Sequence, residues 1–386
     1  MLATRLSRQA TVAMGSALAC AGLLSACGSA ASSATTGSPA SSTASSAASV
    51  STSASAAKTT WVDQPVSFQA GGVTVYATYR HPATTPAQAM PAVLLIAGSG
   101  PTDRNGNSKL LPGPVGTLQT LAGWFSADGV ATLRYDKLGS GQTGLGPYAS
   151  DPDSIGIAPF EQEAAAALRF LASQPGVNQS QLGVFGHSEG ALFALLLADG
   201  FTGGTGAAPH VHTLGLIEPL SERYLDIIAI QVDAQVAAAQ QAGRLTTAQA
   251  ASLTQALAKA IAQLRSAGTV PSGLPAALSS VLSPSSALYL SQADRDDPAS
   301  LAAKLPAGTP VLVTCSNADT QVSCGEVHQL RDGLAQAPAK TDFVQLNGVD
   351  HVLKVDPAGS AANYTKALPF SPQLQGALRS FVRQNM

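Results

Sequence analysis

The chain of 386 residues has a formal net charge of −2, and only 11% of its residues are charged while 45% are hydrophobic. This weak, slightly acidic charge argues against nucleic acid as a partner, because phosphate binding requires a basic surface. The length allows one large domain or two of ordinary size.

Residues 1–26 have the features of a bacterial lipoprotein signal peptide. Two arginines give a positive start, and the apolar stretch 11–24 that follows is too short to span a membrane. The sequence Leu-Ser-Ala-Cys then ends at Cys27 and resembles a lipobox, after which cleavage leaves a lipid-modified cysteine at the N-terminus. We therefore predict lipidation at Cys27 and a location at the extracytoplasmic face of the cell membrane. An ordinary secretory signal cleaved near Ala30 is the alternative.

A low-complexity segment follows the signal peptide. Residues 28–57 are almost wholly Ser, Ala, Thr and Gly and carry no charge. Such a segment cannot bury a core, so we predict that residues 27–57 are a flexible tether to a folded part that begins near residue 58.

Two of the four cysteines remain for the folded part, since Cys20 leaves with the signal peptide and Cys27 is the lipidation site. Cys315 and Cys324 form an even pair in an oxidising compartment, which predicts a disulfide bond. Two free thiols are the alternative.

From residue 61 onward, predicted strands and helices alternate. The first two strands, 66–69 and 73–79, flank a Gly-Gly turn and predict a hairpin. Further strands are predicted at 91–97, 130–136, 182–185, 211–217, 309–314 and 342–346, and helices at 117–128, 160–173, 191–198 and 371–383. Because the strands are apolar on both faces, we predict an α/β fold with a mostly parallel sheet flanked by helices.

The alternation stops between residues 220 and 305, where the sequence is helical and irregular. Leucines and an isoleucine at helical spacing form an apolar stripe over residues 253–264, and Thr246 with Gln249 predicts a capping box before it. We therefore predict a helical cap, 220–305, inserted between two late strands of a core formed by 58–219 and 306–386. The shape of a substrate pocket is expected to depend on how this cap folds over the site.

One motif carries the chemistry. Gly186-His-Ser-Glu-Gly190 is a G-x-S-x-G sequence, with an apolar strand before it and an apolar helix after it. In that setting the serine occupies a strained, exposed turn, and glycines allow the close approach of strand and helix. We predict Ser188 as a nucleophile; a glycine-rich structural turn is the alternative.

A serine nucleophile needs a base, and the base is usually oriented by an acid. In a strand–turn–helix arrangement of this kind the acid and then the histidine follow the serine in the chain. His351 follows a predicted strand and is preferred to His328, which lies in a predicted helix. Asp319 is the first carboxylate after the strand 309–314 and is the predicted acid, with Glu326 as the fallback.

An oxyanion hole needs two backbone N–H groups. We expect one from Glu189, directly after the nucleophile, and the other from Ser99 after the first long apolar strand, with Gly100 as the next choice. The sequence has no histidine or cysteine cluster for a metal and no lysine-containing phosphate loop, so we predict no metal and no cofactor.

Four segments resemble one branch of the α/β-hydrolase superfamily, the bacterial secreted or lipid-anchored serine hydrolases similar to esterases and serine aminopeptidases. They begin at Gly98 (Gly-Ser-Gly-Pro-Thr-Asp-Arg-Asn-Gly), Leu133 (Leu-Arg-Tyr-Asp-Lys-Leu-Gly-Ser-Gly), Gly186 (Gly-His-Ser-Glu-Gly) and Asp350 (Asp-His-Val-Leu-Lys). The resemblance covers roughly residues 62–386 and implies an eight-stranded sheet with a helical cap. Its nucleophile, acid and base fall on Ser188, Asp319 and His351. The cysteine pair around Asp319 departs from the family pattern.

These observations together predict a serine hydrolase that cleaves carboxylic esters of small molecules through an acyl-enzyme, anchored at the membrane by lipid. Two alternatives remain open. A peptidase could use the same three residues, with an acidic group in the cap to receive a free amino terminus. A catalytically inactive binding lipoprotein could keep the fold without the activity.

Overall fold

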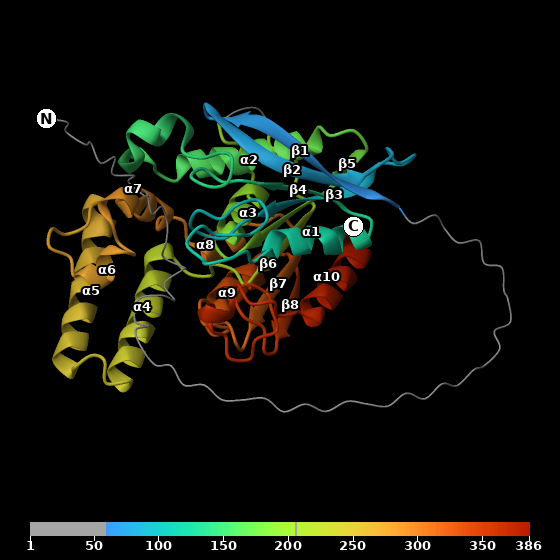
Figure 1. Cartoon of the computed structure of the whole chain (residues 1–386). Helices are drawn as coiled ribbons and strands as arrows, with labels where there is room; N and C mark the ends of the chain where they lie inside the picture. The colour runs from blue at the N-terminus through green and yellow to red at the C-terminus, as the bar shows by residue number, and fades with distance from the viewer. Residues whose placement is uncertain (1–58, 205–206) are drawn as a thin grey trace, which may run out of the picture.

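The computed structural model describes residues 59–204 and 207–386 (Figure 1). The predicted signal peptide, the lipidation site Cys27 and the tether 27–57 lie outside the described residues and stay predictions.

Eight strands form one sheet in the order β1-β2-β4-β3-β5-β6-β7-β8. From β4 to β8 all neighbouring strands are parallel, whereas β1 and β2 form an antiparallel hairpin that pairs with β4. This confirms the predicted eight-stranded, mostly parallel sheet. The strands are β1 (Trp61–Ala70), β2 (Val73–Pro82), β3 (Met90–Ile96), β4 (Ala131–Tyr135), β5 (Val177–His187), β6 (Thr213–Ile217), β7 (Pro310–Ser316) and β8 (Lys340–Leu346).

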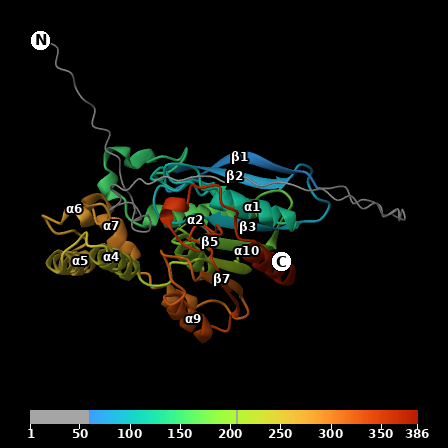
Figure 2. The same cartoon turned by 60° about the horizontal axis from the view of Figure 1, so that its bottom comes forward.

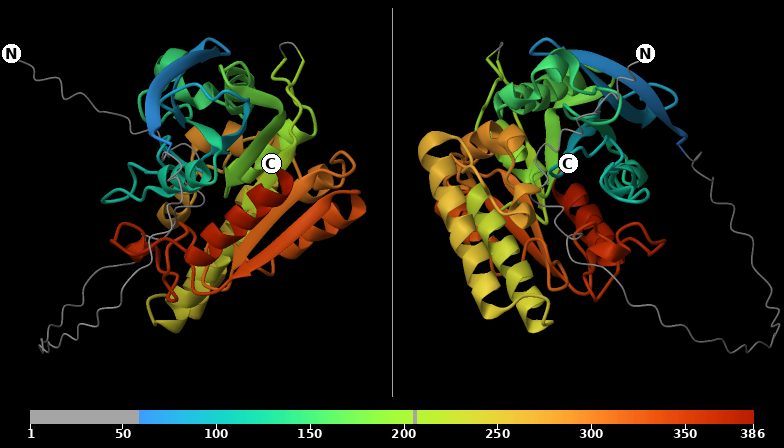
Figure 3. Two further views of the ribbon diagram at one scale, coloured as in Figure 1. Left: turned by 90° about the vertical axis from the view of Figure 1, so that its right-hand side faces the viewer. Right: turned by 60° about the vertical axis from the view of Figure 1, so that its left-hand side comes forward.

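Helices cover both faces of the twisted sheet, as the left panel of Figure 3 shows. One face packs against α1 (Thr117–Ala127) and α10 (Pro372–Asn385), which share a core with the side chains of Val93 and Leu95 of β3. The other face, with Leu94 and Ile96, forms a larger core. The helices in that core include α2 (Ala158–Ala172), α3 (Gly190–Ala198), α8 (Pro298–Ala302) and α9 (Val327–Gln336). Neighbouring residues of β3 are therefore buried on opposite sides, which explains its uninterrupted apolar sequence.

The segment between β6 and β7 is helical, as expected. Its longest helices are α4 (Tyr224–Gln241) and α5 (Thr247–Ala267), which lie side by side in the right panel of Figure 3. The short helices α6 (Ala276–Ser279) and α7 (Pro284–Ala293) follow. The predicted capping box is present, because the Thr246 side chain accepts a hydrogen bond from the N–H of Gln249. Figures 1 and 2 show these four helices projecting to one side of the sheet.

The strand predictions erred mainly in length. β5 begins at Val177, five positions before its predicted start at Leu182. Val177 is followed by four polar residues, 178–181, that are partly or fully exposed, so the start of β5 has no apolar pattern from which a strand could be predicted. Short 3₁₀ helices occur at Gly146–Ser150, Pro152–Ser154 and Ala361–Asn363. In the part of the chain that the structure describes, no helix is both long and apolar enough to cross a bilayer.

Candidate active site

Ser188 lies in the two-residue turn between β5, which ends at His187, and α3, which begins at Gly190. Its φ of 55° is in the left-handed region that side-chain-bearing residues seldom adopt. Backbone hydrogen bonds hold this conformation: the Ser188 N–H donates to the Ile217 carbonyl of β6, and the Ser188 carbonyl accepts from the N–H of Leu220, both at 3.0 Å. Strain supported in this way is typical of functional positions.

The two glycines of the motif permit the tight turn. A Cβ atom on Gly186 would lie 2.1 Å from the Gly190 carbonyl oxygen, and one on Gly190 would lie 2.3 Å from the carbonyl oxygen of Ile96. Neither position can hold a side chain without moving backbone. The motif is therefore the sequence that this strand–turn–helix junction requires, as predicted.

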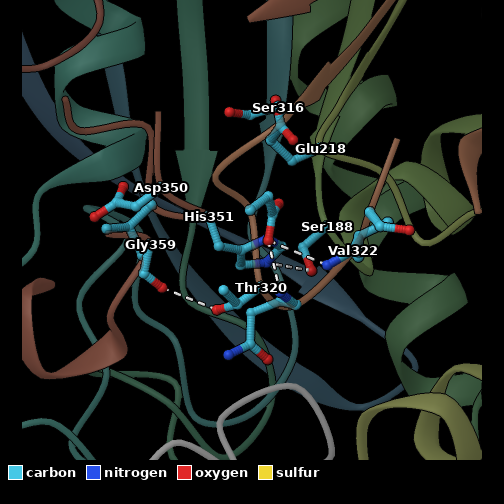
Figure 4. Close-up of polar contacts among 12 residues, drawn as sticks. Ser188, Glu218, Ser316, Thr320, Val322, Asp350, His351 and Gly359 are labelled. Carbon is cyan, nitrogen blue, oxygen red and sulfur yellow. Dashed lines mark hydrogen bonds and ion pairs between the residues drawn. The ribbon is translucent and has the colours of Figure 1, made fainter. Parts of the chain in front are cut away.

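The three predicted residues come together in one hydrogen-bonded chain, of which Figure 4 labels Ser188 and His351. Nε2 of His351 lies 3.0 Å from Oγ of Ser188, and Nδ1 of His351 lies 2.7 Å from Oδ2 of Asp319. Ser188 follows β5, Asp319 follows β7 and His351 follows β8, so all three lie at the carboxyl edge of the parallel strands. All three side chains are buried. This is the arrangement in which an imidazole can take the proton of a serine hydroxyl.

Asp319 is held in place and kept ionised by its surroundings. Burial by itself would raise the pKa of Asp319, but the adjacent His351 and two backbone N–H groups stabilise the carboxylate, and the pKa lies below its usual value. Those N–H groups belong to Gln321 and Val322, and both donate to Oδ1 at 2.7 and 3.1 Å. Thr320 donates to the carbonyl of Gly359, which ties this loop to the one after His351 (Figure 4).

Glu218 is a neighbour of the acid that the sequence analysis missed. It directly follows β6, has a φ of 44° and is fully buried, and its Oε1 accepts a hydrogen bond from the Thr314 hydroxyl. Burial and the negative charge of Asp319 raise the pKa of Glu218 well above its usual value. The sequence signal was slight: one Glu directly after an apolar strand.

His187, the second residue of the motif, is a further part of the site. Its Nε2 donates to the backbone carbonyl of His351 at 2.7 Å. Burial and the nearby His351 lower the pKa of His187 to about 3, so its ring is neutral at any ordinary pH. It holds the backbone of the base in place without adding a charge.

The two residues predicted to supply an oxyanion hole lie close to Ser188: Glu189 follows it in the chain, and Ser99 lines the same pocket. Gly98, the residue before Ser99, lies so close that a Cβ atom on it would be 3.1 Å from Cβ of Ser188. Within the described residues, no backbone or side-chain oxygen accepts from the N–H of Ser99 or Glu189. Neither N–H group is therefore engaged in a hydrogen bond among the described residues.

The side chain of Glu189 points away from that space into a buried polar cluster. Its Oε2 lies 2.7 Å from Nζ of Lys137, and its Oε1 accepts hydrogen bonds from the hydroxyls of Tyr224 and Tyr289, both at 2.7 Å. Burial and the Glu189 charge raise the pKa of both tyrosines well above the usual value, so both remain donors.

An apolar pocket opens at Ser188 and His351. Its wall includes Leu110, Leu111 and Val115 from the loop between β3 and α1, and Val352 and Tyr364 from the segment after β8. No residue of the segment 220–305 lines it, so the prediction that this segment shapes the pocket is wrong for the pocket at Ser188. α4 and α7 instead contact the site through Tyr224 and Tyr289, beside Glu189.

The fallback candidates are not brought to the site. His328 is exposed on α9, and Glu326 accepts from the backbone of Ser323 at the start of that helix. The predicted disulfide between Cys315 and Cys324 is present and closes the loop that carries Asp319. Among the residues described, no group of three or more histidine, cysteine or carboxylate side chains could hold a metal ion.

No protein-family model matches the chain, and no curated protein matches it. Several solved structures, however, match the chain. A ferulic acid complex of Est1E from Butyrivibrio proteoclasticus is 15% identical, with a TM-score of 0.50 over 83% of this chain and 98% of that one. An acetyl xylan esterase from Paenibacillus sp. R4 is 14% identical, with a TM-score of 0.50 over 86% of both chains. An esterase from Pyrococcus furiosus is 14% identical, with a TM-score of 0.50 over 85% of this chain and 92% of that one. At such identities the similarity establishes the fold, which is the α/β-hydrolase fold.

Proposed function

We propose that this α/β-hydrolase-fold protein is a serine hydrolase that cleaves carboxylic esters. The observation that carries the proposal is the hydrogen-bonded chain from Ser188 through His351 to Asp319, at the mouth of an apolar pocket. Solved structures of the same fold that are described as esterases are consistent with it.

The geometry supports a two-step mechanism. Ser188 Oγ attacks the acyl carbonyl while His351 Nε2 takes its proton, and the N–H groups of Ser99 and Glu189 bind the oxyanion. His351 then gives the proton to the departing alcohol oxygen, which leaves an ester between the acyl group and Ser188. Water, deprotonated by the same imidazole, attacks this acyl-enzyme and releases the acid. Asp319 stabilises the imidazolium that forms in each step.

The pocket indicates the class of ester. Its wall consists of small and apolar side chains, with the polar groups of serine, threonine, histidine and tyrosine, and carries no aspartate, glutamate, lysine or arginine among the residues described. An apolar acyl or alcohol group can be buried there without leaving a charge unpaired. A free amino terminus would find no carboxylate to pair with, so the pocket favours an uncharged ester over an aminopeptidase substrate.

One panel tests both the activity and the class. p-Nitrophenyl esters of increasing acyl length and aminoacyl anilides are assayed with a soluble protein that begins near residue 58 and with its Ser188→Ala variant. We expect hydrolysis of the esters, no hydrolysis by the variant and little turnover of the anilides. Turnover of the anilides alone would make the protein a peptidase. Failure of a fluorophosphonate to label Ser188 would make it an inactive binding protein.

We further propose that the protein acts at the outer face of the cytoplasmic membrane, held by lipid on Cys27. The lipobox-like sequence that ends at Cys27 and the uncharged segment after it support this. The full-length Cys27→Ser variant should move from the detergent phase to the aqueous phase in a Triton X-114 partition. A variant that still enters the detergent phase would mean that something other than Cys27 holds the protein there.

A further inference from the structure

A single buried ammonium group contacts both segments that would supply the oxyanion hole. Lys137, in the loop after β4, is 2% exposed, and its Nζ lies 2.7 Å from Oε2 of Glu189. The same Nζ donates a hydrogen bond to the carbonyl oxygen of Gly98. Glu189 is the residue after the nucleophile, and Gly98 precedes Ser99. The two halves of the site, which come from β5 and β3, therefore meet at one cation.

The contact with Gly98 has a consequence for the next N–H. In a trans peptide the carbonyl and the N–H of the following residue point in opposite directions. When Lys137 binds the Gly98 carbonyl on one side of this peptide, the N–H of Ser99 must point to the other side. That N–H has no acceptor among the described residues. A charged donor on the carbonyl also polarises the peptide and strengthens the hydrogen bond that its N–H can give.

The rest of the cluster keeps Lys137 where it is. Glu189 receives Lys137 on one carboxylate oxygen and the hydroxyls of Tyr224 and Tyr289 on the other, so each of its oxygens has a partner. Lys137 and Glu189 side chains are each only 3% exposed, and a buried charge pair of this kind is stable only when its hydrogen bonds are satisfied.

We propose that Lys137 is a positioning residue for catalysis. By holding the Gly98 carbonyl, it orients the Ser99 N–H toward the oxyanion. This inference rests on the proposed ester hydrolysis. Lys137 does not touch the substrate. Its effect is confined to the transition state, since the N–H it orients binds the oxyanion more strongly than the ground-state carbonyl.

The test separates this role from that of a structural ion pair. Lys137→Met alone leaves the Glu189 carboxylate buried without its cation and is expected to destabilise the fold. The double variant Lys137→Met/Glu189→Gln removes both charges, and the glutamine oxygen can still accept from the two tyrosines. The Gly98 carbonyl, however, remains without its donor. Tyr289→Phe is the matched control, because it removes one hydrogen bond to Glu189 and leaves the contact with Gly98 intact.

Three quantities are measured on an ester that the wild type hydrolyses: kcat, KM and the inhibition constant of a trifluoromethyl ketone, which forms an oxyanion on Ser188. Active sites are counted by fluorophosphonate titration, so a partly unfolded variant still gives a kcat per folded molecule.

In the double variant we expect thermal stability above that of Lys137→Met. We also expect kcat lower by about 10- to 100-fold, a part of the roughly 10²–10³ that loss of a whole donor costs. KM should change less than about threefold, and the ketone should weaken by the same factor as kcat. Tyr289→Phe should lose far less kcat than the double variant, because Lys137 keeps its contact with the Gly98 carbonyl.

Recovery of wild-type kcat in the double variant, or equal losses of kcat in the double variant and Tyr289→Phe, would overturn the role of Lys137. Those results require an active wild type. A wild type that neither hydrolyses esters nor reacts with fluorophosphonate would overturn the proposed function instead.

Discussion

Oγ of Ser188 lies 3.0 Å from Nε2 of His351, although 163 positions separate the two residues in the chain. Because they act as a unit with Asp319, removal of either should remove most of the activity. We expect Ser188→Ala and His351→Ala each to lower kcat on the order of 10⁴- to 10⁶-fold, and Asp319→Asn somewhat less. Near wild-type kcat in either of the first two variants would contradict the assignment. Circular dichroism shows whether each variant is folded.

The rate should depend on pH through one ionisation. Catalysis needs a neutral His351, so kcat/KM should rise with pH. The pKa of His187 is about 3, so its ring is neutral throughout an assay from pH 5 to 9. The pKa of Asp319 lies below its usual value, so this carboxylate is already ionised there. The profile of kcat/KM should therefore have a single rising limb, as expected for one general base. A flat profile, or two limbs below pH 9, would require another base.

Glu163 on α2 should make the fold less stable as the pH rises. Burial raises the pKa of Glu163 from 4.5 to about 8, and only one of its oxygens has a partner among the described residues, the N–H of Leu138. Below pH 4.5 the side chain is protonated in both the folded and the unfolded state. Between pH 4.5 and 8 the unfolded chain loses this proton and the folded one keeps it, so stability falls as pH increases, on the order of 1 kcal/mol per pH unit. Above pH 8 the contribution is constant.

Glu163→Gln removes this ionisation and keeps the shape of the protonated side chain. The difference in Tm between the variant and the wild type should grow from pH 5 to pH 8 and then level off, which differential scanning calorimetry can follow. Other buried carboxyl groups contribute equally to both proteins and cancel in the difference. A difference in Tm that is the same at every pH would mean that Glu163 has an ordinary pKa.

The disulfide should matter more to the activity than to the fold. Cys315 and Cys324 are nine positions apart and close a loop around Asp319, for which chain entropy predicts about 3 kcal/mol of stability. Asp319 must hold the His351 ring to a fraction of an ångström, and a loop is the least rigid place for it. The double variant Cys315→Ala/Cys324→Ala should therefore lose kcat at temperatures at which it is still folded. Unchanged kcat below its Tm would leave the bridge as a stabiliser only, with Asp319 held by the N–H groups of Gln321 and Val322.

The sequence by itself determined the parts of this protein that depend on local pattern. Apolar runs such as Pro91–Ile96 predict buried strands because a parallel sheet covered on both faces excludes polar side chains. Gly186 and Gly190 around Ser188 predict the turn because a Cβ atom at either position would lie only 2.1 or 2.3 Å from a backbone carbonyl oxygen, so only glycine fits. Chain order then selected Asp319 and His351, since the carboxyl ends of parallel strands meet at one edge.

Only the tertiary structure decided which residues surround these three. Glu218, His187 and Lys137 form hydrogen bonds with residues that lie 96, 164 and 52 positions away, namely Thr314, His351 and Glu189. No spacing rule relates such pairs, because strand order in the sheet brings them together rather than any local period. The protonation of a carboxyl group also depends on burial, which cannot be read from residue type: burial raises the pKa of Glu163 and of Glu218 above the usual value for glutamate. The position of the segment 220–305 also depends on the tertiary structure. The pattern of an amphipathic helix predicts which face of the helix is buried, but it does not predict which part of the protein that face packs against.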